Sequence, residues 1–434
     1  MSTGSDTIFA RSSGQGRAGI AVWRVSGPMA CRAVETLAGK VPPPRRAAYR
    51  QVFTASGEQL DDGIVLYFPG PHSATGEDLA EFHLHGSPAV SHRFAEELTS
   101  LGLRAAAAGE FTQRAFLNGR MDLLAIEGLG DLLDAETEAQ RQQAMVVAGG
   151  GVRERIASWR RSLISALAVL EAAVDFPDEE DIPADIAARA FPILYSIREE
   201  MQTALAASDG AQRLKEGINL AIIGPPNAGK SSLLNKLAGE ERAIVSDIAG
   251  TTRDIVSIRI DIAGRLVNVL DTAGLREGSE DPIEREGMTR AAATAQMADI
   301  VIALRDGTAP QVNEWPTTSG LVIRVANKSD KGFDQTDELA ISLANGEGWD
   351  QLMTQLEAAV RAQASPSFFP RERQQMLVRN AAGRIEHMLQ SPHLEPELLS
   401  EDLRACIRAL DDLVGQSTTE DVLGTIFSSF CIGK

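Results

Sequence analysis

The chain has 434 residues, of which 44% are apolar and 24% charged, with a formal net charge of −18. This length exceeds what one hydrophobic core normally organises, so several domains are expected. The acidity argues against a protein whose whole surface wraps nucleic acid, because phosphate binding depends on Lys and Arg. Any RNA contact has to be local or shared with a partner.

The pattern of apolar residues and cysteines predicts a cytoplasmic protein. No stretch approaches the roughly 18 uninterrupted apolar residues of a membrane span, and residues 1–19 lack the apolar run of a signal peptide. The three cysteines, Cys31, Cys406 and Cys431, are too few and too scattered for a disulfide framework or a four-ligand metal site. A reducing compartment fits this composition.

The first part of the chain predicts an α+β unit followed by helices. β-rich runs at 19–26, 63–68 and 79–84 alternate with Gly and Pro, which is typical of strands joined by turns. Residues 153–174 carry apolar side chains three and four positions apart, which predicts an amphipathic helix. Its apolar stripe consists of Ile156, Trp159, Leu163, Leu167, Leu170 and Val174. A second helical stretch covers about 186–205.

Strand and helix patterns alternate between residues 217 and 360, which indicates a parallel, doubly wound α/β sheet. Its apolar runs lie at 218–223, 300–304 and 321–325. Helical character returns after Arg371, and Ser417 with Glu420 resembles a capping box that opens a final helix. The simplest architecture is one helical domain interrupted by an inserted α/β domain.

A phosphate-binding loop is predicted at residues 224–231, which read Gly-Pro-Pro-Asn-Ala-Gly-Lys-Ser between a predicted strand and helix. Its glycines let backbone N–H groups converge on phosphates, Lys230 supplies a charge to the β and γ oxygens, and the Ser231 hydroxyl can ligate Mg²⁺. The expected nucleotide contacts here are Asn227, Ala228, Gly229, Lys230, Ser231 and Ser232.

Two further segments match the switch loops of such a domain. In Asp271-Thr272-Ala273-Gly274, Asp271 can hold the Mg²⁺ shell while the Gly274 amide senses the γ-phosphate. In the preceding loop, Gly250-Thr251-Thr252, we expect Thr252 to complete the metal's coordination when triphosphate is bound.

The segment Asn327-Lys328-Ser329-Asp330, which follows the strand at 321–326, predicts that the bound nucleotide carries guanine. A carboxylate at Asp330 can accept hydrogen bonds from N1–H and the N2 amino group of guanine, a donor pair that adenine lacks. Ser342, Leu343 and Ala344 are expected to close the base pocket through backbone contacts.

The sequence leaves the hydrolytic machinery open. Leu275 stands where Ras-like switches have a water-orienting glutamine, and an alkyl side chain cannot orient water. Asn227 either ligates a monovalent cation or only shapes the loop. Glu284 either activates the water or is a solvated switch-loop carboxylate.

The chain resembles a family along nearly its whole length, the tRNA-modification GTPases called MnmE or TrmE. The resemblance rests on the GTPase motifs and on segments 6–8, 19–28, 75–78, 109–112 and 114–119, and on the terminal Cys431-Ile432-Gly433-Lys434. It implies an N-terminal folate-binding and dimerisation domain (1–118), a discontinuous helical domain (119–215 and 371–434) and an inserted G domain (216–370).

The resemblance also implies an activity and partners. Family members form homodimers and act with the FAD-containing protein MnmG in a heterotetramer. They install an aminomethyl or carboxymethylaminomethyl group at C5 of the tRNA wobble uridine. A tetrahydrofolate derivative, of the 5-formyl or 5,10-methylene type, is the presumed one-carbon donor, and GTP hydrolysis to GDP is required.

For the GTPase site the resemblance implies K⁺ in place of an arginine finger. By motif match the K⁺ ligands are Asn227 and the backbone of Ser246, Ile248 and Thr251, with Asp247 and Ala249 also in this nucleotide-binding loop. Glu284 matches the water-activating glutamate, although one extra residue after Asp271 leaves Glu280 or Glu286 as alternatives.

For folate the resemblance implies Arg24, Glu81, Arg120 and Lys434, with Arg120 standing where the family usually has lysine. Glu81, His83 and His85 are predicted on one strand face, which suits pterin recognition or, as a rival, a His-x-His metal site. Cys431 can serve as nucleophile, redox partner or mere tail residue. The rival functions are an RNA-binding GTPase of ribosome assembly and a folate-binding scaffold that only senses nucleotide.

Overall fold

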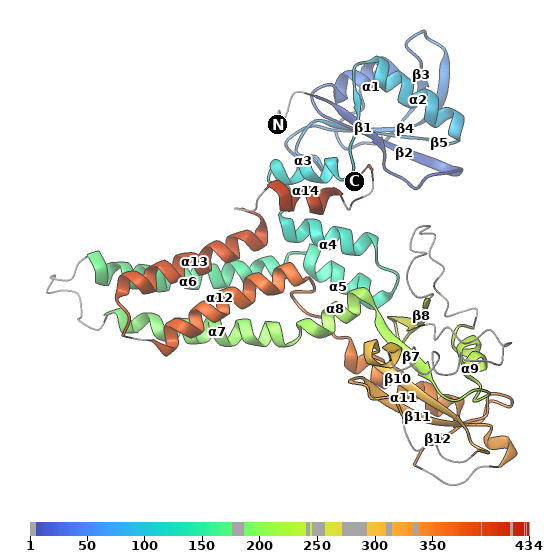
Figure 1. Ribbon diagram of the computed structural model, residues 1–434. Coiled ribbons are helices and arrows are strands. Elements are labelled where there is room, and N and C mark those ends of the chain that lie inside the picture. The colour runs from blue at the N-terminus through green and yellow to red at the C-terminus, as the bar shows by residue number, and fades with distance from the viewer. Residues whose placement is uncertain are drawn as a thin grey trace. The chain divides into compact units, whose positions relative to one another are not determined.

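The computed structural model describes residues 6–175, 186–239, 244, 257–270, 293–309, 315–332, 337–391, 393–416, 420–428, 430 and 432–433. It divides into two compact units, Met1–Gly130 with Asp411–Lys434, and Asp131–Leu410. Figure 1 labels most of the elements of both. None of the helices within these described ranges is long and apolar enough to cross a bilayer. The protein is a multidomain chain of mixed helix and sheet.

The first unit contains a six-stranded sheet in the order β3-β4-β5-β2-β1-β6. Its strands are β1 (Ile8–Arg11), β2 (Ala18–Ser26), β3 (Ala48–Phe53), β4 (Gln59–Phe68), β5 (Leu79–Gly86) and β6 (Arg104–Ala105). The three strands expected from the sequence are β2, β4 and β5. Alternation along them buries Trp23, Phe82 and Leu84 in one core cluster with Val34 of α1 (Ala30–Ala38) and Phe94 of α2 (Pro88–Ser100).

The two ends of the chain meet in this unit. Phe427 of α14 (Glu420–Ser428) is buried with Ile126 of α4 (Leu123–Leu133). Gly109, just before α3 (Glu110–Leu117), has φ 68°, and a Cβ there would lie 2.3 Å from the Phe427 carbonyl oxygen. Beyond α14, Ile432 pairs with Ala108 in an antiparallel bridge. The last part of the chain therefore completes the fold of the first.

A helical bundle is built from two parts of the chain, one before residue 217 and one after residue 371 (Figure 1). Its helices are α5 (Glu138–Ala148), α6 (Gly151–Asp175), α7 (Ala190–Ala206), α8 (Ser208–Glu216), α12 (Glu372–Gln390) and α13 (Pro396–Val414), with a 3-10 turn at Ile186–Arg189. In the predicted stripe of α6, Ile156, Trp159, Leu163 and Leu170 are buried. Cys406 of α13 contacts the Ala381 carbonyl of α12 at 3.6 Å, and burial raises the pKa of this thiol to about 12.

The second sheet has the order β12-β11-β10-β7-β9-β8 and is parallel except for the β8–β9 pair. Its strands are β7 (Ile218–Ile223), β8 (Ser257–Ile262), β9 (Arg265–Leu270), β10 (Ile300–Asp306), β11 (Leu321–Asn327) and β12 (Leu339–Ala340). α9 (Lys230–Leu237) and α11 (Trp349–Gln363) pack on one face of it. After β7 the chain first adds β8 and β9 on one side of that strand and later adds β10 on its other side, so the strand order reverses at β7. Ligands bind at such a switch point, beyond the carboxyl ends of the strands.

Candidate functional site

The predicted phosphate loop connects β7 to α9 at this switch point. Gly224 has φ 156°, and a Cβ on it would lie 1.9 Å from the Leu304 carbonyl oxygen. Asn227, exposed at the top of the loop, has φ 63°, a conformation that Asn tolerates better than most residues. Gly229 has φ 100° and lies directly before the first turn of α9. The loop has the backbone shape that directs N–H groups toward an anion.

Lys230 folds back over the loop. Its ammonium donates hydrogen bonds to the carbonyl oxygens of Gly224 and Pro225, both at 2.9 Å. Burial lowers the pKa of Lys230, because the charged form loses hydration. An ammonium has three donors, so one is left for a phosphate oxygen. A phosphate would also supply the counter-charge that favours the protonated form.

Asn327 joins the phosphate loop to the base-binding segment. This buried side chain donates from Nδ2 to the Ala228 carbonyl at 2.9 Å and accepts at Oδ1 from the Leu343 N–H at 3.2 Å. A Cβ at Gly229 would lie 2.4 Å from the Asn327 amide nitrogen, so glycine is needed for the close approach. The structure thus brings together three motifs that lie apart in the sequence.

Asp330, which is predicted to bind guanine, lies in a tight turn after β11. Asp330 belongs to the 3-10 turn Ser329–Lys331 and accepts a hydrogen bond from the Ser342 hydroxyl at 2.6 Å. Ser342 is buried, whereas Asp330 is exposed. Ser342 therefore contributes its side chain, in addition to the backbone contacts expected from the sequence. Leu343 follows it and Ala344 is exposed.

One acidic residue of this region was missed by the sequence reasoning. Asp306 ends β10, and its Oδ2 lies 2.6 Å from the ammonium of Lys328. The hydrogen bond from Lys328 is the largest cause that lowers the pKa of Asp306 to about 2. The available signal was the position of Asp306 at the carboxyl end of β10, since the neighbouring strand β11 ends directly before Lys328.

Several predicted residues lie outside the described part of the chain. They comprise Ser246, Asp247, Ile248, Ala249, Gly250, Thr251, Thr252, Asp271, Thr272, Ala273, Gly274, Glu280, Glu284, Glu286, Ser417, Cys431 and Lys434. Ser231 and Ser232 are described and lie in the first turn of α9.

A second polar cluster lies on the sheet of the first unit, where Arg24 of β2 is the register partner of Glu81 of β5. Two guanidinium nitrogens of Arg24 donate to Glu81 Oε1 at 3.0 and 3.2 Å, and the guanidinium lies 5.8 Å from the ring centre of Phe111. His83 Nε2 lies 3.3 Å from Glu81 Oε2. Arg24, Glu81 and His83 are each partly exposed, so solvent and ligands can reach them.

His85, on the same strand face, has a different partner. Its backbone N–H and its Nδ1 lie 2.9 and 2.7 Å from the two carboxylate oxygens of Asp61 on β4. This hydrogen bond raises the pKa of His85. Asp61, Asp62 and His85 offer ligand atoms within 4.8 Å of one another, whereas His83 pairs with Glu81. The two imidazoles of the predicted His-x-His pattern therefore have separate partners.

Arg120 lies beside the loop at Gly76, since a Cβ on that glycine would be 3.2 Å from Arg120 Cγ. The same loop is fixed by Asn118, whose amide donates to the Thr75 carbonyl at 2.7 Å. The carboxyl-terminal segment is fixed at Gly433, whose carbonyl accepts from the Ser12 hydroxyl at 2.9 Å. Arg120 and Gly433, the residue before Lys434, therefore both have contacts within the first unit.

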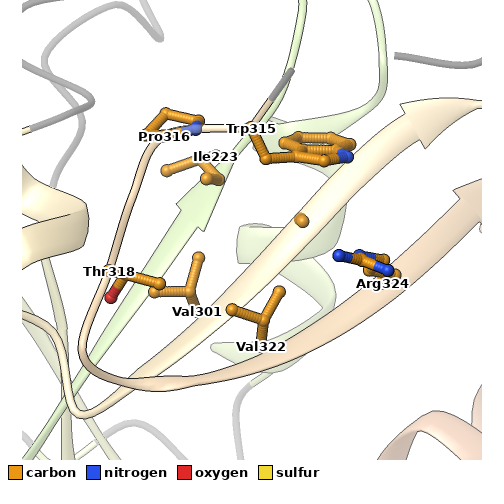
Figure 2. Close-up of a pocket in the computed structure, with 8 residues that line it drawn as sticks. Ile223, Val301, Trp315, Pro316, Thr318, Val322 and Arg324 are labelled. Atoms are coloured by element: carbon orange, nitrogen blue, oxygen red, sulfur yellow. The ribbon is translucent and has the colours of Figure 1, made fainter. Parts of the chain in front are cut away.

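A cavity of 280 Å³ lies elsewhere on the second sheet, on the face opposite to α9 and α11. Figure 2 shows residues that line it, among them Trp315 and Arg324 and the apolar Ile223 and Val301. It is separate from the phosphate loop and the base turn, whose residues do not line it.

Comparisons with known proteins cover almost the whole chain. Residues 7–120 match the family model described as GTP-binding protein TrmE N-terminus, and residues 123–431 match the MnmE helical domain. The chain is 46% identical to the tRNA modification GTPase MnmE of Azorhizobium caulinodans over 100% of both proteins. It is 45% identical to that of Phenylobacterium zucineum over 99% of this chain and 100% of that protein. The chain belongs to the MnmE (TrmE) family.

Proposed function

We propose that this chain is a GTPase that takes part in the modification of tRNA at the wobble uridine. It binds GTP between the phosphate loop and the turn at Asp330 and hydrolyses it to GDP. The observation that carries this proposal is the position of Asn327, which is bonded both to the phosphate loop and to the base segment. Such a link joins a phosphate-binding element to a base-reading element in one site.

The test is made in cells that lack this chain. We expect the wobble uridine of their tRNA to lose its aminomethyl-type group, and a plasmid carrying the wild-type gene to restore it. A plasmid with Lys230→Ala is expected to restore nothing at equal protein level. Nucleoside analysis of purified tRNA by mass spectrometry measures the outcome. Unchanged modification in the deletion strain would remove tRNA modification from the proposal.

Two cations complete the proposed site. Ser231 and Thr252 would hold Mg²⁺, and Asn227 with the backbone of Ser246, Ile248 and Thr251 would hold K⁺. Asn227 fits this role because the residue is exposed and its side-chain carbonyl oxygen is an acceptor that can ligate a cation. When bound, such cations supply positive charge toward the phosphates.

The residues of this chain then act on the substrate. The backbone of 227–232 and Lys230 hold the phosphates, and Asp330 with the segment Ser342–Ala344 orients the base. Glu284 is proposed to orient the attacking water, since Leu275 cannot.

Hydrolysis is expected to be faster in K⁺ than in Na⁺ at equal ionic strength, because the larger ion fits a cage built from an amide and backbone carbonyls. The measurement is initial phosphate release at saturating GTP, with an Asn227→Ala variant as comparison. We expect that variant to lose the difference between the two salts. Equal rates in both salts for the wild type would take Asn227 out of this role.

The first unit is proposed to bind a tetrahydrofolate derivative and to form the homodimer. Arg24, Glu81, Arg120 and Lys434 are the proposed folate contacts, and the partial exposure of the Arg24–Glu81 pair supports access for a ligand. Cys431 directly precedes Ile432 and Gly433 in sequence, and these two residues contact Ala108 and Ser12 within the first unit. That placement supports a role for Cys431 near the one-carbon unit.

The domains are proposed to follow the boundaries 1–118, 119–215, 216–370 and 371–434, with the G domain inserted in the helical domain. The position of β7 to β12 between α8 and α12 in sequence supports this insertion. The proposed partner is the FAD-containing MnmG, in a cytoplasmic heterotetramer that also binds tRNA. With a net charge of −18, the chain is suited to share the RNA contact with that partner.

A further inference from the structure

Arg305 is a buried arginine of the second sheet to which the proposed function gives no role. It is the last residue but one of β10, and only 2% of it is exposed. An arginine keeps its positive charge inside a protein, so a buried guanidinium needs an acidic or carbonyl partner. The Nε of Arg305 donates a hydrogen bond to Oε2 of Glu338. This buried ion pair joins two segments that lie apart in the sequence.

The guanidinium is also held in place by backbone. Its Nη1 donates to the carbonyl oxygens of Asp306 and Ala309, both at 3.2 Å. These two bonds fix Arg305 against the turn that follows β10. The contact with Glu338 is therefore made from a fixed position, which limits the freedom that the pair has to lose on forming.

The pair connects β10 to β12 across the strand between them. The register partner of Arg305 on β11 is Ala326, and the partner of Ala326 on β12 is Ala340. Both partners are alanines, whose small side chains leave room for an arginine to extend across the sheet. Glu338 directly precedes β12. Its carboxylate is thus the point at which Arg305 holds the beginning of that strand.

β12 has little else to hold it in place. It consists of two residues and lies at the edge of the sheet, where it pairs with β11 alone. Directly after it, the Ile341 N–H donates to the Ala326 carbonyl at 2.8 Å, and the Ser329 N–H donates to the Ile341 carbonyl at 3.1 Å. So short an edge strand forms few ladder bonds, and an ion pair at its start adds a side-chain anchor.

The segment that follows β12 completes the proposed base pocket. Ser342 lies four positions after Glu338, and its hydroxyl donates to Oδ1 of Asp330 at 2.6 Å. The next residue, Leu343, donates its N–H to Oδ1 of Asn327 at 3.2 Å. The position of β12 therefore determines whether Ser342 reaches Asp330 and holds that carboxylate in one orientation.

We infer that Arg305 is a positioning residue for guanine recognition: through Glu338 it anchors β12, and thereby places Ser342 against Asp330. This inference rests on the proposed nucleotide site and adds to it a buried ion pair outside the residues that contact the base. Arg305 acts through Glu338 and does not itself contact the nucleotide.

The test compares full-length wild type with Arg305→Met, Glu338→Ala and the double variant. Displacement of labelled GDP gives the Kd, and the amplitude of the signal gives the fraction of protein that is folded. We expect each single variant to raise the Kd for GDP about tenfold, the effect of losing one hydrogen bond to a charged group. The double variant is expected to show the same rise, because both changes break one contact.

Two further measurements distinguish positioning from a loss of stability. The rate of single-turnover hydrolysis at saturating GTP is expected to change less than about twofold, because the base contact is the same in the ground state and the transition state. The preference for GDP over inosine diphosphate, which lacks the N2 amino group, is expected to shrink. Arg305→Lys, whose ammonium can still donate to Glu338, is expected to keep the Kd within about threefold of wild type.

The matched control is Arg213→Met, which removes an ion pair at the other end of the same strand. Arg213 of α8 donates to Asp299, the residue before β10, at 2.7 Å. This control is expected to leave the Kd for GDP and the preference over inosine diphosphate unchanged.

Several results would overturn the role of Arg305. An unchanged Kd in Arg305→Met would do so, as would a lower folded fraction with the Kd of the remaining protein unaltered. If Arg305→Met gives no soluble protein, Glu338→Gln decides, since it keeps the shape of the side chain and removes its charge. A wild-type Kd and base preference in that variant would equally contradict the inference.

These outcomes are separable from failure of the nucleotide site. If wild-type protein binds no guanine nucleotide with Mg²⁺ present, the proposed function fails before any variant is compared. If Asp330→Asn changes base preference while Arg305→Met and Glu338→Ala change nothing, the site stands and only the role of Arg305 is wrong.

Discussion

Lys230→Ala is expected to slow GTP hydrolysis by on the order of 100- to 1000-fold, the usual cost of removing one charge-stabilising donor from a transition state. The Lys230 ammonium is held over the phosphate loop by the carbonyls of Gly224 and Pro225, where the β and γ oxygens of a bound nucleotide would lie. The alanine variant keeps the loop glycines, so the loop should still fold. Single-turnover hydrolysis at saturating GTP measures the effect.

The control is Lys236→Ala, on the same helix. Lys236 lies 4.6 Å from the ring centre of Trp349, in the last turn of α9, and does not reach the loop. Its replacement is expected to change turnover less than twofold. If Lys230→Ala hydrolysed GTP at the wild-type rate, the loop at 224–231 would not be the catalytic phosphate site.

Asp330→Asn is expected to weaken GTP binding by about 100-fold or more and to improve binding of xanthosine triphosphate. Each hydrogen bond to a charged group contributes about 1.5–3 kcal/mol, and guanine makes two such bonds to the carboxylate. The asparagine amide presents a donor to the N2 amino group of guanine, which repels it. Xanthine has a carbonyl at that position and can accept the bond.

This preference is measured by displacement of labelled GDP from the protein, with GTP and xanthosine triphosphate each used as the competitor. Asp350→Asn, an exposed carboxylate at the start of α11, serves as the control and should retain the wild-type preference for GTP. Unchanged selectivity in Asp330→Asn would mean that the base pocket lies elsewhere in the chain.

The parts of the fold that depend on local sequence could be predicted. The alternation in β2 and β5, the stripe in α6 and the glycines around Lys230 each report their structure within a few residues. The Asp306–Lys328 pair could not be predicted in this way, because it follows from the register between β10 and β11. Local patterns contain no information on which residues face each other across two parallel strands.

The cluster of Arg24, Glu81 and His83 shows the same limit. Family resemblance identified Arg24 and Glu81, but their contact is a property of the β2–β5 register. The contact of His85 with Asp61 depends in the same way on the pairing of β4 with β5. The contact of Phe427 with Ile126 joins residues about three hundred positions apart. The spacing of apolar residues within α4 or within α14 does not predict which helix the other one contacts.

The meeting of the chain ends has a consequence for synthesis on the ribosome. Domains generally begin to fold from the N-terminus as the chain emerges. The first unit, however, needs residues 411–434, which are made after the whole of Asp131–Leu410. Until then Phe427 and Phe430 are absent, and the side of Ile126 that they cover is left open. The part of the protein translated first is therefore the last to be finished, and its apolar side at Ile126 stays uncovered while translation continues.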